Sequence, residues 1–190
     1  MKKEQEIVRK LEYREYLLSG GIKLRRLKES DKDDMYEYTS NEECCFFLKW
    51  GPHTRVRQAS EFIRKRLQDT EVPADLLWGI ELTEESKLIG VVRVYHIDFD
   101  NRQAEISYIL NPRYAGKGYA TMAVRQVMDV CFRELNLEKV IAFYADANRK
   151  SEKLLERCGA VKDTEWKEQM EIKGRIYQIR RCFVLRRKVL

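Results

Sequence analysis

The residues best suited to chemistry lie in a glycine-rich turn between a predicted strand and a predicted helix. The segment Leu110–Thr121 reads LNPRYAGKGYAT, and its two glycines and two alanines leave the main chain bare. Exposed N–H groups at a helix start, together with the positive end of the helix dipole, form an anion site. Lys117 adds a cation to this row of amides. We therefore expect the turn to bind a diphosphate. The alternative is a strand-to-helix turn in which the glycines only relieve backbone strain and no ligand binds.

Two other phosphate-binding motifs do not fit this segment. The P-loop pattern Gly-x-x-x-x-Gly-Lys-Ser/Thr does not occur in the sequence. The dinucleotide fingerprint needs a small residue where Thr121 stands and an acidic residue at the end of the next strand. Glu138 lies at the required distance, but it precedes the predicted strand Val140–Tyr144. A dinucleotide-binding fold is therefore disfavoured.

A carboxylate on a predicted strand is the second candidate for chemistry. Alternate residues of Ala104–Leu110 are apolar, which places Glu105 and Ser107 on the opposite face of the strand. A carboxylate in that position is either an exposed strand residue or a general base that removes a proton, directly or through water.

Asn148 and Ser151 begin a predicted helix that ends before Gly159. Asn is among the best N-cap residues, because its side-chain oxygen accepts a hydrogen bond from an N–H group in the first turn. From the residues alone, capping is the simpler interpretation, and contact with a ligand is the alternative.

The elements that position these residues follow from the hydrophobic pattern. The pattern predicts helices over residues 1–18, Asp31–Thr39, the segment through Ala59, Phe62, Ile63 and Leu67, Ala120–Leu135 and Asn148–Cys158, and strands over Ile22–Leu27, Leu76–Leu82, Leu88–His96, Ala104–Leu110, Val140–Tyr144 and on both sides of Gly174. The first helix has an apolar face formed by Ile7, Val8, Leu11 and Leu18. The order of elements predicts an α/β fold with a mixed sheet.

Length and charge exclude several classes of protein. The chain has 190 residues, 37 Lys and Arg against 31 Asp and Glu, and a formal charge of +6, which fits one domain. The basic runs Lys23–Lys28 and Arg180–Lys188 are not interleaved with a stripe of aromatic residues, so a nucleic-acid partner is disfavoured. No apolar run has the length of a membrane span, and the charged N-terminus does not resemble a signal peptide. We expect a cytoplasmic protein without a membrane partner.

A metal cofactor is not expected. The five cysteines follow no metal-ligand spacing and are Cys44, Cys45, Cys131, Cys158 and Cys182. Neither His53 nor His96 has a nearby partner in the sequence. Asp98 and Asp100 match the start of a calcium loop, but Arg102 stands at the next ligand position.

Three segments in order resemble the GNAT superfamily of acetyl-CoA-dependent N-acetyltransferases, and within it the RimJ/RimL-like branch. They read FFLKWGPHTRVRQASEFI, AEISYILNPRYAGKGYATMAV and ADANRKSEKLLERCGAV. The resemblance covers most of residues 22–190, which predicts one transferase domain there and an accessory N-terminal helix within residues 1–21. The coenzyme loop of the family is written Gln/Arg-x-x-Gly-x-Gly/Ala, and the sequence departs from it at the first position, Ala115.

The resemblance implies a mixed, mostly antiparallel sheet with helices on both faces. It also implies that Ala104–Leu110 and Val140–Tyr144 run parallel and splay apart, and that the arm of acetyl-CoA, the co-substrate, lies between them. The coenzyme-binding residues implied are Ile109, Leu110, Ala115, Gly116, Lys117, Gly118, Tyr119, Ala120, Thr121, Asn148 and Ser151.

The resemblance further implies direct transfer of an acetyl group to a primary amine in a ternary complex. Glu105 is the expected general base, and Ser151 or a tyrosine is expected to protonate the leaving thiolate. The residues expected near the amine are Trp50, His53 and Tyr144, with Phe47 on the same segment as the first two. For the three residues of that segment, anchoring the loop on the core is the alternative. The acceptor is a protein N-terminal α-amine or a small-molecule amine.

A non-catalytic acyl-CoA-binding regulatory module is the alternative from another class. The presence of Glu105 and Ser151 favours the enzyme over this alternative. A homodimer is left open, since nothing in the sequence decides the oligomeric state.

Overall fold

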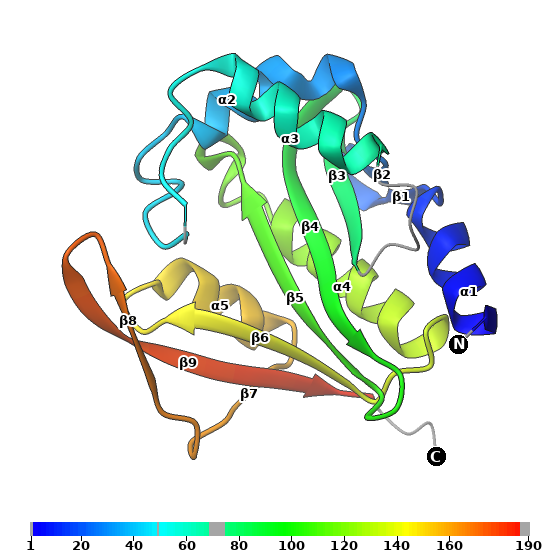
Figure 1. Ribbon diagram of the computed structural model, residues 1–190, viewed down its shortest axis with the longest axis vertical. Coiled ribbons are helices and arrows are strands. Elements are labelled where there is room, and N and C mark those ends of the chain that lie inside the picture. Colours follow the sequence, from blue (N-terminus) through cyan, green and yellow to red (C-terminus); the bar gives the residue numbers. More distant parts are fainter. Residues whose placement is uncertain (1, 49, 69–74, 187–190) are drawn as a thin grey trace.

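The computed structural model describes residues 2–48, 50–68 and 75–186, and within these ranges nine strands form one sheet (Figure 1). The helices are α1 Lys2–Glu12, α2 Lys32–Thr39, α3 Val56–Gln68, α4 Tyr119–Arg133 and α5 Arg149–Arg157, with 3-10 turns η1 Ser19–Gly21, η2 Glu29–Asp31 and η3 Pro112–Tyr114. The strands are β1 Tyr16–Leu18, β2 Ile22–Arg25, β3 Leu76–Leu82, β4 Lys87–Asp98, β5 Gln103–Leu110, β6 Lys139–Ala145, β7 Val161–Lys162, β8 Glu168–Ile172 and β9 Arg175–Leu185. None of the described helices is long and apolar enough to cross a bilayer.

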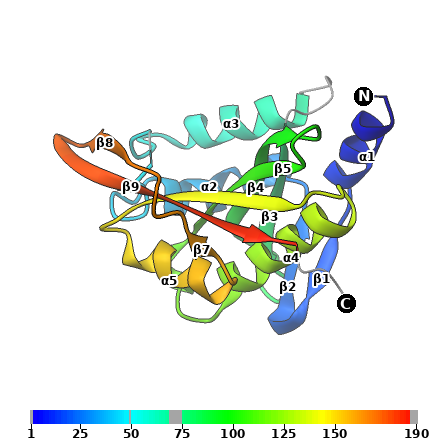
Figure 2. The same cartoon turned by 90° about the horizontal axis from the view of Figure 1, so that it is seen from below.

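Helices cover both faces of the sheet, as predicted. Figure 2 shows α4 and α5 on one side of the sheet and α3 on the other. The apolar stripe of α4, which includes Val124 and Val127, packs on β4 and β5 and also contacts β2 and β6 in the larger core. A second core lies on the opposite face, where Tyr38 of α2 and Ile63 of α3 pack on Leu88 of β4. The mixed, mostly antiparallel sheet expected from the sequence is confirmed.

Strands β5 and β6 are parallel and pair only at their beginning. The paired residues are Gln103 with Lys139, Ala104 with Val140 and Glu105 with Ile141. Beyond them β6 continues beside β9, as far as Ala145 opposite Ile179, while β5 continues beside β4. The two strands therefore separate from Ile106 onward, which confirms the predicted splay (Figure 1). We call this separation of the two backbones the slot.

The N-terminal segment differs from the prediction. Helix α1 ends at Glu12, and Leu18 lies on strand β1, which pairs with β2, so the helix predicted over residues 1–18 was too long. The reason is a tertiary contact, since the Tyr16 ring packs edge-on against buried Trp78 at 6.1 Å. Val8 and Leu11 of α1 belong to the larger core. The division of the chain after residue 21 stays a prediction.

Candidate active site

The turn after β5 has the geometry of an anion site. Gly116 and Gly118 both have φ of +82°, a conformation that glycine adopts without strain, and α4 begins directly after Gly118. The N–H of Met122 donates to the carbonyl of Gly118, which closes the first helical turn. The preceding N–H groups, from Tyr119 to Thr121, have no acceptor within the helix. A Cβ built on either glycine meets no other atom within 4 Å, so there is open space beside this backbone for a ligand.

Hydrogen bonds of the buried residue Asn111 hold this turn in place. The Asn111 N–H donates to the carbonyl of Ile89 at 2.7 Å, and its side chain donates to Glu37 at 3.0 Å while accepting from the N–H of Arg113. The N–H of Ala115 donates to the carbonyl of Pro112, so this amide is engaged within the turn itself. The turn is thus fixed before any ligand arrives, which lowers the entropic cost of binding.

Lys117 is held over two aromatic rings at the edge of the turn. Its Nζ lies 5.8 Å from the ring centroid of Tyr114 and 6.0 Å from that of Tyr119. Its positive charge therefore stays close to the exposed N–H groups. The turn combines main-chain donors, a helix start and a cation, which fits the diphosphate of coenzyme A.

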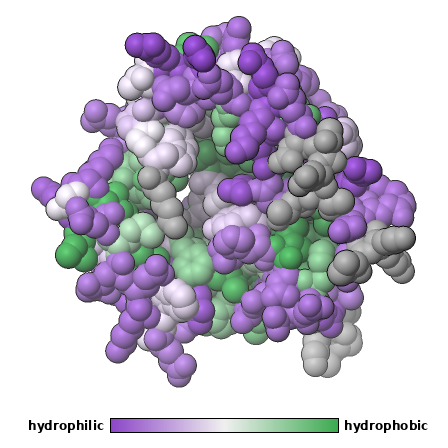
Figure 3. All heavy atoms as spheres, viewed as in Figure 1, coloured by the Kyte–Doolittle hydropathy of each residue, from purple (hydrophilic) through white to green (hydrophobic). Residues whose placement is uncertain are grey.

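The connection between α2 and α3 reaches across the slot between β5 and β6. Glu43 forms an ion pair with Lys150 of α5 at 2.7 Å, and the Cys44 thiol donates to the carbonyl of Leu110 at 3.6 Å. The Phe47 ring lies edge-on to that of Tyr177 on β9, with 5.8 Å between centroids. Figure 3 shows this side of the molecule hollowed near its centre, with hydrophobic side chains inside and hydrophilic ones around them.

Helix α5 brings Asn148 and Ser151 to the slot. The Asn148 side-chain oxygen accepts the N–H of Ser151 at 3.1 Å, so this residue caps the helix in the way its sequence predicts. The Ser151 hydroxyl shares a hydrogen bond of 2.7 Å with the hydroxyl of Tyr108 on β5. Burial raises the pKa of Tyr108 above its usual value, so the phenol stays protonated.

Tyr108 is a candidate that the sequence did not single out. It belongs to the apolar face of its strand, and its partner Ser151 lies 43 residues further along the chain. No local pattern links the two. Together they join β5 to α5 beside the slot and place two hydroxyl groups there.

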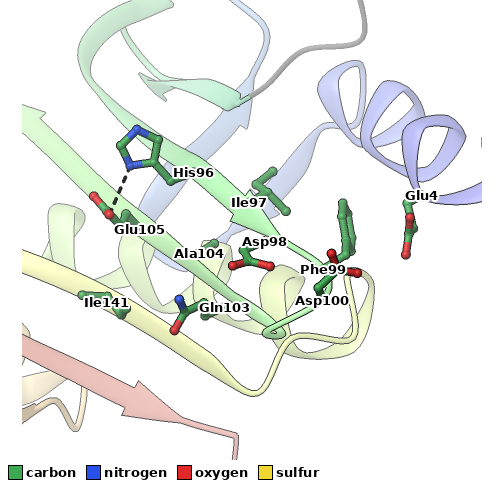
Figure 4. A pocket seen from close by; sticks show the side chains of 10 residues that line it. All are labelled: Glu4, His96, Ile97, Asp98, Phe99, Asp100, Gln103, Ala104, Glu105 and Ile141. Carbon is green, nitrogen blue, oxygen red and sulfur yellow. Dashed lines mark ion pairs between the residues drawn. The ribbon is translucent and has the colours of Figure 1, made fainter. Parts of the chain in front are cut away.

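Glu105 lies at the point where the slot begins. It stands opposite Tyr95 of β4 and Ile141 of β6, on the sheet face away from α4, as predicted. Its Oε1 atom is 3.1 Å from Nδ1 of His96 (Figure 4). Burial, with the charge and hydrogen bonding of Glu105, raises the pKa of Tyr95 to about 12, so Tyr95 remains a hydrogen-bond donor at neutral pH.

A pocket of about 510 Å³ adjoins Glu105. It is lined by Glu4, His96, Ile97, Asp98, Phe99, Asp100, Gln103, Ala104, Glu105 and Ile141 (Figure 4). Four of these side chains are carboxylates, and none of the lining residues is Lys or Arg. The pocket is therefore suited to a cation with apolar parts.

The carboxylate of Asp98 is held by hydrogen bonds from Asn101 in the β4–β5 turn. The backbone N–H of Asn101 donates to Asp98 at 2.9 Å and lowers the pKa of this carboxyl group, so it is ionised at neutral pH. In the described part of the chain, no group of three or more His, Cys, Asp and Glu side chains is arranged to hold a metal ion.

The residues predicted near the amine do not line this pocket. Trp50 is exposed and stacks on His53, with 5.3 Å between ring centroids. Nδ1 of His53 is 2.9 Å from the hydroxyl of Thr39, and burial lowers the pKa of His53. Tyr144 is only 6% exposed and lies in the larger core. Roles for Trp50, His53 and Tyr144 in acceptor binding stay predictions.

The chain is similar to known acetyltransferases over most of its length. Residues 22–161 match the family described as acetyltransferase (GNAT) domain. A spermidine N(1)-acetyltransferase of Vibrio cholerae serotype O1 is 27% identical over 173 residues, which are 91% of this chain and 98% of the relative. A putative ribosomal N-acetyltransferase of Bacillus subtilis, YdaF, is 33% identical over 98 residues, which are 50% of this chain and 54% of the relative.

Solved structures show the same fold. The crystal structure of the Vibrio cholerae spermidine N-acetyltransferase in complex with CoA and spermine superimposes with a TM-score of 0.74 and 27% sequence identity. The match covers 88% of this chain and 96% of the other.

Proposed function

Since the chain belongs to the GNAT acetyltransferase family and is an acetyl-CoA-dependent N-acetyltransferase, we propose that it acetylates a small polyamine by direct transfer in a ternary complex. The observation that carries this choice of acceptor is the acidic pocket next to Glu105. Its volume lies within the usual range of small-molecule sites, roughly 300–1,000 Å³.

The chemistry of a polyamine matches the lining of this pocket. A polyamine carries several ammonium groups joined by short methylene chains. Glu4, Asp98 and Asp100 offer negative charge, and Ile97 and Phe99 offer apolar contact between them. The similarity to two spermidine acetyltransferases, from Vibrio cholerae and Escherichia coli, supports the same acceptor class.

The proposed reaction uses residues on both sides of the slot. Glu105 takes a proton from the ammonium group and leaves a neutral amine, which attacks the thioester carbon. An N–H of Ile109 or Leu110 donates to the thioester oxygen and stabilises the charge that develops there. Ser151, hydrogen-bonded to Tyr108, gives a proton to the departing thiolate and regains one from the attached nitrogen, which loses its second proton as the amide forms. The turn 114–121 holds the coenzyme so that its thioester lies in a fixed position relative to the amine and to these residues.

Removing the Tyr108 hydroxyl tests the proton donor. Tyr108→Phe keeps the ring in the core but removes the hydroxyl group that is hydrogen-bonded to Ser151. We expect kcat to fall roughly 10- to 100-fold, which is no more than the smallest usual contribution of a general acid. The KM for acetyl-CoA should stay the same. Tyr16→Phe is the matched control, because its hydroxyl contacts Glu134 outside the slot. An unchanged kcat in Tyr108→Phe would exclude the pair from the reaction.

A protein α-amine is the second candidate acceptor. The partial match to a putative ribosomal N-acetyltransferase supports it, and so does the resemblance of three segments to the RimJ/RimL-like branch. We also propose that the protein belongs to that branch, and that residues 22–190 form one transferase domain preceded by an accessory helix.

An acceptor panel tests the proposed substrate class. The panel contains spermidine, butane-1,4-diamine, butylamine and a short peptide with a free α-amine, with thiol release as the signal and intact mass as confirmation. We expect kcat/KM for the diamine to exceed that for butylamine at least about tenfold, because the second ammonium gains a carboxylate contact worth about 1.4 kcal/mol or more. Preference for the peptide would overturn the polyamine proposal, and coenzyme binding without turnover would indicate a regulatory module.

A further inference from the structure

His96 lies at an irregularity of the sheet that turns its side chain toward Glu105. Tyr95 pairs with Glu105 and Asp98 pairs with Gln103, so two residues of β4 oppose Ala104 alone. This is a β-bulge with one extra residue on β4, and His96 within it has φ of +48°. In an unbroken strand, His96 would point to the face opposite Tyr95. Here it points toward Glu105 (Figure 4).

We infer that His96 is the proton-relay residue of the enzyme, which takes from Glu105 the proton of the acceptor ammonium and releases it to solvent. The inference rests on the proposed role of Glu105 as general base. A non-glycine residue with a left-handed backbone costs free energy and persists only where the surrounding structure holds it. Such residues, like β-bulges, are found more often at functional sites than elsewhere.

The His96 side chain is more exposed to solvent than that of Glu105, as a relay from Glu105 to solvent requires. Nδ1 of His96 is 3.1 Å from Oε1 of Glu105, which is within reach of a direct transfer. The Glu105 side chain is 24% exposed and that of His96 is 73% exposed. A proton therefore arrives on a largely covered carboxylate and leaves from an imidazole in water.

The groups around Glu105 leave His96 as the side chain suited to accept this proton. On β4, burial and the negative charge of Glu105 raise the pKa of the Tyr95 phenol, so it keeps its own proton, and its ring lies 4.9 Å from that of His96. Asp98 on β4, Asp100 in the turn and Glu4 on α1 line the same pocket and add negative charge, while Gln103 on β5 and Ile141 on β6 do not titrate. Imidazole is the common proton shuttle of proteins.

The relay balances in protons. The ammonium group gives one proton to the carboxylate of Glu105, and the neutral amine that remains attacks the thioester. When the hydrogen of the neutral imidazole is on Nε2, the lone pair of Nδ1 faces Glu105 and accepts the proton of its carboxyl group. The imidazolium then releases one proton to water or buffer. Exchange with solvent restores the starting tautomer, and Glu105 is again ionised.

Two variants of His96 test the relay without straining the backbone. His96→Gly and His96→Asn both tolerate a positive φ, and neither can carry a proton. At low buffer concentration we expect kcat with the best acceptor of the panel to fall about tenfold in each, with an unchanged KM for acetyl-CoA. Added imidazole should restore most of the turnover of His96→Gly, in which the ring's space is free, and little of that of His96→Asn.

Ser86→Gly is the matched control, since Ser86 also has a left-handed backbone, with φ of +50°, in the turn between β3 and β4. Its kcat should equal that of the unchanged enzyme and should not respond to imidazole. Unchanged kcat in His96→Gly, or a loss that imidazole does not restore, would overturn the relay. Glu105→Gln in the same assay separates the two claims. A slow Glu105→Gln with no rescue of His96→Gly refutes the relay alone, and a fully active Glu105→Gln refutes the base and the relay together.

Discussion

Replacing Gly118 by Asp should weaken acetyl-CoA binding by about two to three orders of magnitude while the protein stays folded. The new carboxylate points into the open space beside the turn, where the diphosphate lies in the proposed complex. Two unit charges about 4 Å apart repel by roughly 4 kcal/mol at an effective dielectric constant of about 20. Because solvent at this turn screens part of the repulsion, we expect the dissociation constant of acetyl-CoA to rise by about 10²- to 10³-fold.

Calorimetric titration with acetyl-CoA, alongside thermal unfolding of the free protein, measures this effect. Gly174→Asp is the matched control, because Gly174 also has a positive φ, of +74°, and open space beside it, but lies in the β8–β9 turn. Asp is among the residues that tolerate this backbone conformation. Gly174→Asp should bind the coenzyme normally. Unchanged affinity in Gly118→Asp would remove the diphosphate from this turn.

Replacing Glu105 by Gln should lower kcat at neutral pH by about 10²- to 10³-fold, within the usual contribution of a general base, about 10²- to 10⁴-fold. Gln keeps the shape of the side chain, and Glu105 lies at the start of the slot, away from the glycine-rich turn, so the pocket and the coenzyme affinity should be largely spared. Without a base, the reaction depends on the small fraction of acceptor that is already neutral. Because primary alkylamines have a pKa of about 10, like that of Lys, the residual rate should rise about tenfold per pH unit below that value.

Steady-state kinetics from pH 6 to pH 9, with the coenzyme affinity measured separately, test this prediction. Glu171→Gln is the control, since Glu171 is an exposed carboxylate on β8 outside the pocket. A Glu105→Gln enzyme with full turnover at pH 7 would exclude Glu105 from the mechanism. A flat pH profile with reduced turnover would indicate that Glu105 positions the acceptor instead of taking its proton.

Features with a local cause were predictable from the sequence. The bounds of β3, Leu76–Leu82, match the prediction, because a short apolar run between turn residues suits a strand buried on both faces. The buried stripe of α4 follows from its helical spacing. The turn proposed to bind the diphosphate is equally local, since its two glycines at positive φ and the start of α4 lie within a few residues of each other.

Features that depend on contacts distant in the sequence were not predictable. The bulge that turns His96 toward Glu105 depends on the register of β4 against β5, and the residue types of β4 do not reveal it. The Tyr108–Ser151 hydrogen bond joins residues on different elements. The acidic pocket combines Glu4 of α1 with residues near position 100, and no motif contains both. The helix that lies outside the sequence resemblance therefore contributes to the pocket.

A crystal structure of the protein soaked with acetyl-CoA tests the central claim most directly. We expect diphosphate density against the N–H groups at the start of α4, the pantetheine arm between β5 and β6, and the acetyl group pointing toward Glu105. Diphosphate density elsewhere on the molecule, or a slot filled by side chains with the coenzyme excluded, would contradict it.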